Sequence, residues 1–81
     1  MTQHTDLLEA GQAIRRRRMV LGLSQEQLAE RAGLHRNYVG FLERGERNAS
    51  LTTLFSLARA LELTIGELFA GVGAGPCAEG S

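Results

Sequence analysis

The sequence lacks several features that would place it in another compartment. It has a single cysteine, Cys77, which cannot form a disulfide within one chain. No apolar run approaches the roughly 18 residues that span a membrane, and the first residues lack the basic and apolar segments of a signal peptide. We therefore expect a reduced, cytoplasmic protein without a membrane partner.

The chain also lacks lysine and has no net charge. A zero charge taken alone argues against nucleic-acid binding, for which a basic surface is expected. The charges are unevenly distributed, however: residues 1–48 hold eight arginines and six acids, and residues 49–81 hold one arginine and three acids. The difference, +2 against −2, is consistent with one face that contacts DNA and one that does not.

Groups that would carry catalysis or bind metal are missing as well. His4 and His35 have no cysteine or carboxylate partners at metal-ligand spacing. No nucleophile–base pair and no phosphate-binding glycine loop can be identified. We therefore expect neither an enzyme nor a protein with a metal, cofactor or small-molecule ligand.

What the sequence does contain is helical periodicity. No segment alternates apolar and polar residues over the length of a strand, and the only proline is Pro76. This predicts an all-α domain over residues 1–70, followed by a flexible Gly-rich tail at 71–81. We expect five helices: from a capping box at Asp6 and Glu9 to Gly22, from Ser24 to Gly33, from about His35 to Arg44, from Ser50 to Leu61, and from Thr64 to near Phe69.

The stretch from Gln25 to Arg44 meets the demands of a helix-turn-helix. Two helices that cross at a short turn need a small residue at the crossing and a turn residue that tolerates positive φ. Ala29 and Gly33 are such residues. The apolar residues expected to face the core on either side of the turn are Leu28, Ala32, Leu34, Val39 and Leu42.

These residues resemble the Cro/lambda-repressor-like helix-turn-helix family over roughly residues 7 to 70. The resemblance is carried by Gly22-Leu23-Ser24-Gln25-Glu26-Gln27-Leu28-Ala29-Glu30-Arg31-Ala32-Gly33-Leu34, by Tyr38-Val39 and by Leu42-Glu43-Arg44-Gly45. It implies a compact five-helix fold and a DNA-binding regulator. Within the family, residues 36–40 and 43–48 are similar to the controller proteins of restriction-modification systems.

The third helix is the predicted recognition helix. At about 100° per residue, Arg36, Asn37 and Gly40 share a polar and small face opposite an apolar one. Arg36 can contact guanine, and Asn37 can pair with adenine or reach a phosphate. Gly40 would let the backbone approach the groove closely. Phe41 departs from the family, in which polar residues are common here; it either touches a thymine methyl or pads the edge of the core.

Other residues are predicted to contact phosphates, which supply affinity and register. The resemblance implies this role for Gln25, at the start of the second helix. Further candidates are Arg15, His35, Tyr38, Arg44, Arg47 and Asn48. An ordinary solvated surface is the alternative for each of these residues.

The run Arg15–Arg18 cannot face DNA as a whole, because four consecutive helical residues point in four directions. The resemblance implies that Arg18 pairs with Glu43 and braces the first helix against the recognition helix. Arg16 and Arg17 are expected to be solvated.

A chain of this size recognises few base pairs, so we expect a symmetric dimer on a (pseudo)palindromic operator. The predicted interface consists of Leu63, Ile65, Leu68, Phe69 and Val72. The resemblance implies an autoregulating controller, with RNA polymerase as a further partner. Two alternatives are the antitoxin of a toxin–antitoxin pair, with the tail as its toxin-binding segment, and a helix-turn-helix scaffold used only for protein contacts.

Overall fold

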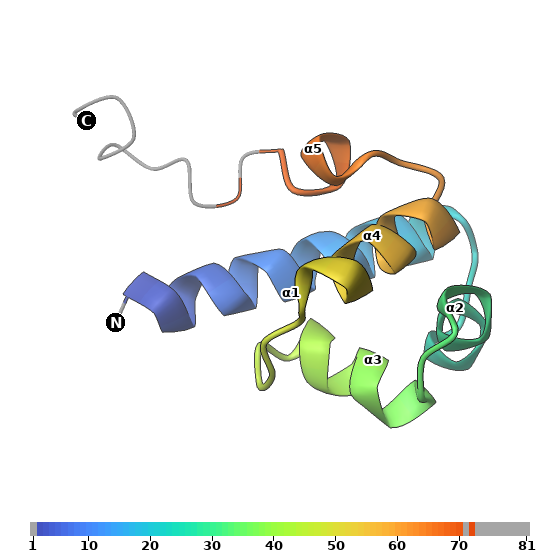
Figure 1. Cartoon of the computed structure of the whole chain (residues 1–81), viewed down its shortest axis with the longest axis horizontal. Helices are drawn as coiled ribbons and strands as arrows, with labels where there is room; N and C mark the ends of the chain where they lie inside the picture. The colour runs from blue at the N-terminus through green and yellow to red at the C-terminus, as the bar shows by residue number, and fades with distance from the viewer. Residues whose placement is uncertain (1, 71, 73–81) are drawn as a thin grey trace.

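The structure, a computed structural model, describes residues 2–70 and 72. It contains five helices within this range and no strand, so the predicted all-α class is confirmed (Figure 1). The helices are α1 (Thr2–Val20), α2 (Gln25–Ala32), α3 (Arg36–Glu43), α4 (Leu51–Ala60) and α5 (Ile65–Leu68). Apart from Val72, the predicted tail, with Cys77, lies outside the described residues.

Short polar side chains begin three of the helices as predicted. The Ser24 hydroxyl accepts the N–H of Gln27, whose side chain in turn accepts the N–H of Ser24. Thr64 and Glu67 form the same reciprocal capping box at α5, and the Ser50 hydroxyl caps α4. Each cap satisfies amides that have no partner within the helix, so it fixes where the helix starts.

The predicted start of the first helix is wrong. Asp6 lies inside α1, which begins four residues earlier at Thr2. Residues 2–5 contain neither glycine nor proline, so nothing in them stops a helix from continuing toward the N-terminus. A capping signature is worth only about 1 kcal/mol, too little to end a helix that its surroundings continue.

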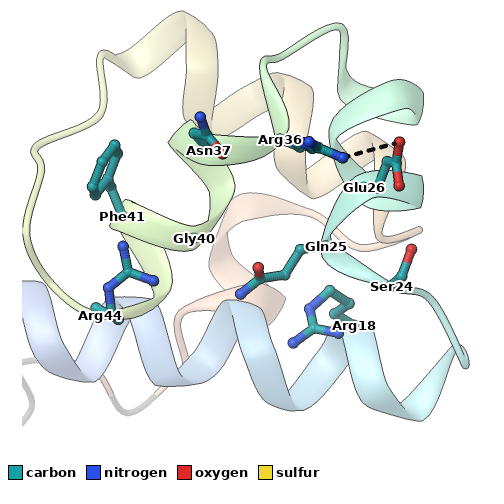
Figure 2. A pocket seen from close by; sticks show the side chains of 9 residues that line it. All are labelled: Arg18, Ser24, Gln25, Glu26, Arg36, Asn37, Gly40, Phe41 and Arg44. Atoms are coloured by element: carbon teal, nitrogen blue, oxygen red, sulfur yellow. Dashed lines mark ion pairs between the residues drawn. The ribbon is translucent and has the colours of Figure 1, made fainter.

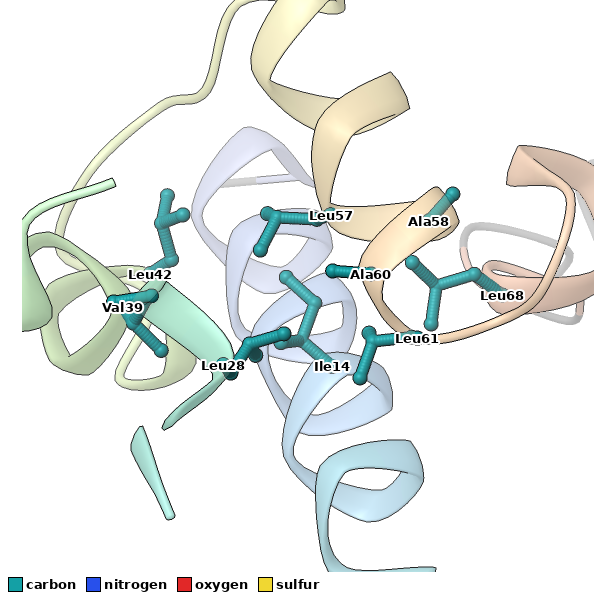
Figure 3. Close-up of a cluster of buried hydrophobic side chains, with 10 residues drawn as sticks. Ile14, Leu28, Val39, Leu42, Leu57, Ala58, Ala60, Leu61 and Leu68 are labelled. Carbon is teal, nitrogen blue, oxygen red and sulfur yellow. The ribbon is translucent and has the colours of Figure 1, made fainter. Parts of the chain in front are cut away.

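The core lies where all five helices meet. Leu28, Val39, Leu57 and Leu61 are fully buried there, with Ile14 of α1 and Leu68 of α5 beside them (Figure 3). Burying each large aliphatic side chain contributes about 1.5–3 kcal/mol. The long helix α1 separates α2 and α3 from α5 in Figure 1. None of the helices in residues 2–70 is apolar and long enough to cross a bilayer.

The apolar stripe of α4 is only partly buried. Its C-terminal half contributes Leu57 and Ala58 to the core, whereas Leu51 and Phe55 near its start are 65% and 46% exposed. Helical spacing alone does not show how far the core extends along the helix.

Candidate nucleic-acid interface

Helices α2 and α3 form the predicted helix-turn-helix. Gly33 ends α2 in the left-handed region, at φ 72°, and its N–H donates to the last carbonyls of the helix. Ala29 is buried at 2% exposure, and Leu28, Val39 and Leu42 face the core as expected. Because the core fixes both helices, the opposite face of α3 is held at a set angle to the start of α2.

An open groove of about 620 Å³ runs between the start of α2 and the outer face of α3 (Figure 2). It brings together most of the residues predicted from the sequence to contact DNA. The lining includes Gln25, Arg36, Asn37, Gly40, Phe41 and Arg44, together with Arg18, Ser24 and Glu26. Five predicted phosphate contacts do not line this groove: Arg15, His35, Tyr38, Arg47 and Asn48.

Arg36 and Asn37 occupy the first turn of α3 and are both exposed. Nη1 of Arg36 lies 3.6 Å from Oε2 of Glu26 across the groove, and both side chains are more than half exposed. Such a surface ion pair contributes little, because water screens both charges. The Arg36 guanidinium is therefore available to exchange Glu26 for another partner.

Gly40 has a different environment from the one predicted. It is buried, and a Cβ added there would lie 3.3 Å from Nη1 of Arg44 and 3.4 Å from Oε1 of Gln25. The space above this glycine is thus filled by two of the protein's own side chains. Its small size makes room for Gln25 and Arg44, which are the groups that face outward.

The Arg18–Glu43 ion pair implied by the resemblance is present and forms part of a network. The Glu43 carboxylate, 3% exposed, accepts from Nε and Nη2 of Arg18 at 2.6 and 3.0 Å. It also accepts from Nε2 of Gln25 at 3.0 Å. Arg18 donates in addition to the carbonyl of Leu23 at 2.8 Å. One buried carboxylate therefore joins α1, α2 and α3 and orients the Gln25 amide beneath the groove.

Phe41 plays a role that neither sequence interpretation included. The guanidinium carbons of Arg44 and Arg47 lie 5.2 and 4.9 Å from the centre of its ring, within the range of cation–π attraction. Arg44 also contacts Glu46, with Nε 3.2 Å from Oε1. Phe41 and Arg44 are three residues apart on a helix, a spacing at which side chains meet. The contact between Arg44 and the ring could therefore have been predicted from the sequence.

The side chains of His35 and Tyr38 form hydrogen bonds within the chain. Nδ1 of His35 accepts the N–H of Asn37 at 3.2 Å, which makes His35 the N-cap of α3. The Tyr38 hydroxyl donates to the carbonyl of Asn48 at 3.0 Å and so ties the loop after α3 to the helix. In the free protein the proton of this hydroxyl is thus engaged within the chain, and its contact with a phosphate stays a prediction.

The four arginines Arg15–Arg18 have different environments, as helical geometry requires, and one of them differs from its prediction. Arg15 and Arg16 are exposed. Arg17 was expected to be solvated, but its Nε donates to the carbonyl of Leu61 at 3.0 Å, at the end of α4, where cationic groups are favourable. That partner lies 44 residues away in the sequence, so no local pattern could have indicated it.

A match to a family model identifies the protein family in which this arrangement of helices occurs. The model described as Helix-turn-helix matches residues 14–68, which include α2, α3 and α4. The chain belongs to this helix-turn-helix family. The match confirms the resemblance drawn from residues 22–45, and the all-helical fold agrees with it.

This helix-turn-helix protein is similar to several controllers. It is 53% identical over 55 residues to control protein C.SmaI of Serratia marcescens, a match that spans 68% of this chain and 66% of that protein, slightly under two thirds of its length. It is 42% identical over 62 residues to control protein C.BamHI of Bacillus amyloliquefaciens, covering 75% of each. The crystal structure of the restriction-modification controller protein C.AhdI from Aeromonas hydrophila superposes with a TM-score of 0.77 at 52% identity, covering 79% of this chain and 97% of that one. These similarities place the chain among DNA-binding transcription regulators of this family.

In this helix-turn-helix protein, the residues predicted to form a dimer interface differ in their exposure to solvent. Leu68 is 5% exposed and belongs to the core, because the single turn of α5 points it inward. Leu63, Ile65 and Phe69 pack partly against that core. Two apolar side chains of the preceding helix α4, Leu51 and Phe55, are more exposed, at 65% and 46%.

Proposed function

We propose that this protein is a sequence-specific regulator that binds a (pseudo)palindromic operator as a homodimer and controls its own restriction-modification genes. The observation that carries the proposal is the groove between α2 and α3, which gathers Gln25, Arg36, Asn37 and Arg44 on one open face. A recognition helix presents its first residues to base edges in the major groove. The core residues behind α3 hold that face rigid.

Within this proposal Arg36 and Asn37 are the base-reading residues. An arginine can donate two parallel hydrogen bonds to O6 and N7 of guanine, and asparagine pairs in the same way with adenine. Glu26 is a weak, exposed partner of Arg36, so its loss on binding costs little. Gly40 leaves room for Gln25 and Arg44, and the ring of Phe41 contacts Arg44 and Arg47, so both residues adjoin the side chains that flank the base-reading pair.

Phosphate contacts flank this central region. Gln25 lies at the start of α2, where free amides favour an anion. Arg44, Arg47 and the exposed Asn48 side chain form the opposite flank. Arg15 is a further exposed candidate on α1. His35 and Tyr38 support the contact surface through their internal bonds.

The proposed dimer uses the last two helices. Leu63, Ile65, Phe69 and Val72 are partly exposed, and α4 carries two more exposed apolar side chains, Leu51 and Phe55. A two-fold axis there would have to place the two recognition helices about 34 Å apart, one turn of DNA. Dimerisation coupled to operator binding would make regulation depend on protein concentration, and RNA polymerase at the same promoter is the further partner.

No relative described above is an antitoxin, and we do not propose that role. The test is a footprint of the protein on DNA upstream of its own gene, combined with sedimentation of free protein and complex. We expect protection of a symmetric site and two chains per site. Binding that is equally strong on unrelated duplexes, or a complex that contains a single chain on a symmetric site, would contradict the proposal.

A further inference from the structure

Phe41, Arg44 and Arg47 form a cationic cluster, of which Phe41 and Arg44 line one end of the groove and Arg47 lies outside it. Figure 2 shows Phe41 and Arg44 side by side, at the opposite end from the Arg36–Glu26 pair. Arg44 ends α3, whereas Arg47 lies in the loop that follows. The aromatic ring is the group that both guanidinium groups share.

We propose that Phe41 is a positioning residue, which holds Arg44 and Arg47 together as a preformed clamp for phosphate groups of the DNA backbone. This inference rests on the proposed function, since it assigns a role within the same surface. Phe41 itself contacts neither base nor phosphate in this account; it acts through the two arginines.

The physical argument begins with the cost of ordering long side chains. A free arginine explores many rotamers, and binding has to restrict them, which reduces affinity. An aromatic face attracts a guanidinium and leaves the N–H groups in its plane free for other partners. Two arginines that already rest on one ring therefore reach a phosphate with less loss of freedom than two unrestrained ones.

Charge and exposure support the same role. Two guanidinium groups close together repel each other, and the negative face of the ring offsets part of that repulsion. The Glu46 carboxylate contacts Nε of Arg44, and both of these side chains are about half exposed. A partly exposed ion pair of this kind gives way readily to a phosphate. The cluster is thus ordered before binding and open to an anion.

The test replaces the ring and keeps the arginines. Phe41→Leu removes the aromatic face but retains an apolar, helix-forming residue, and Phe41→Tyr is the matched control that retains the ring. Affinity is measured for the operator and for an unrelated duplex at several salt concentrations. We expect Phe41→Leu to weaken the affinity for the operator and the affinity for the unrelated duplex by a similar factor, about fivefold. It should also make both affinities depend less steeply on salt concentration. Phe41→Tyr should stay near wild type.

A second readout needs no DNA. Protons next to a guanidinium that rests on a ring are shifted upfield in the NMR spectrum; we expect this shift for Arg44 and Arg47 in the wild type and in Phe41→Tyr, and its loss in Phe41→Leu. If Phe41→Leu does not fold, Phe41→Met takes its place, with the same expectations.

Unchanged affinity and salt dependence in a folded ring-free variant would overturn the inference, as would a loss confined to the operator. A wild-type protein that binds no duplex would instead contradict the proposed function, while the NMR shifts still test the clamp.

Discussion

Arg18 and Glu43, 25 residues apart in the sequence, form a bidentate ion pair in which the carboxylate is 3% and the arginine side chain 13% exposed. The same carboxylate accepts from Gln25. The pair therefore joins the long first helix to the recognition helix and fixes a side chain proposed to contact DNA. Its role is to hold α3 in place.

Removing one member of this pair should be costly. Arg18→Met leaves the Glu43 carboxylate buried without its main partner, and we expect the free energy of unfolding to fall by about 3–5 kcal/mol. The double variant Arg18→Met/Glu43→Leu removes both charges and should regain much of that loss. Urea unfolding followed by circular dichroism measures both. Losses that simply add in the double variant would show that the pair is not coupled.

The crossing of α1 and α3 depends on Gly11. A Cβ at this position would lie 2.2 Å from the carbonyl oxygen of Leu42 and 2.7 Å from that of Glu43, both backbone atoms that cannot move alone. Gly11→Ala should therefore destabilise the fold by roughly 2–3 kcal/mol. Gly66→Ala is the matched control, since the nearest atom to its Cβ is 3.9 Å away. Thermal unfolding should separate the two; equal melting temperatures would refute the close contact.

Replacing Gly40 should change the stability of the fold and the affinity for DNA in different directions. An alanine there meets only the ends of the Arg44 and Gln25 side chains, at 3.3 and 3.4 Å, which need to shift only slightly, so Gly40→Ala should fold at least as stably as the wild type, with a gain of up to about 1 kcal/mol from helix propensity. Displacing those two side chains should nevertheless weaken DNA binding severalfold. Melting temperature and fluorescence anisotropy on the same samples test this. A variant that binds like the wild type would show that Gln25 and Arg44 need no such room.

Much of the fold could be predicted because its signals are local. Ser24, Ser50 and Thr64 cap helices within three residues of themselves, and Gly33 ends one by its own backbone geometry. Contacts between distant segments had no such signal. The bond from Arg17 to Leu61 and the close contact at Gly11 depend on how helices cross, which periodicity does not specify.

The candidate site shows the same division. Sequence spacing brought Arg36, Asn37 and Gly40 to one face of α3, and the groove contains all three. It could not show that Gly40 is covered by two side chains, or that the Tyr38 hydroxyl is used by the loop. The Arg18–Glu43 pair was accessible only through the family resemblance, because nothing local links residues 18 and 43.

The most direct test of base recognition is the affinity of Arg36→Ala for the operator and for an operator with its contacted guanines replaced. Arg16→Ala, an exposed arginine of α1 outside the groove, is the charge-matched control. We expect Arg36→Ala to cost about 1–3 kcal/mol on the operator and to erase the preference for guanine, with Arg16→Ala close to wild type. A folded Arg36→Ala variant that keeps both affinity and preference would contradict the account.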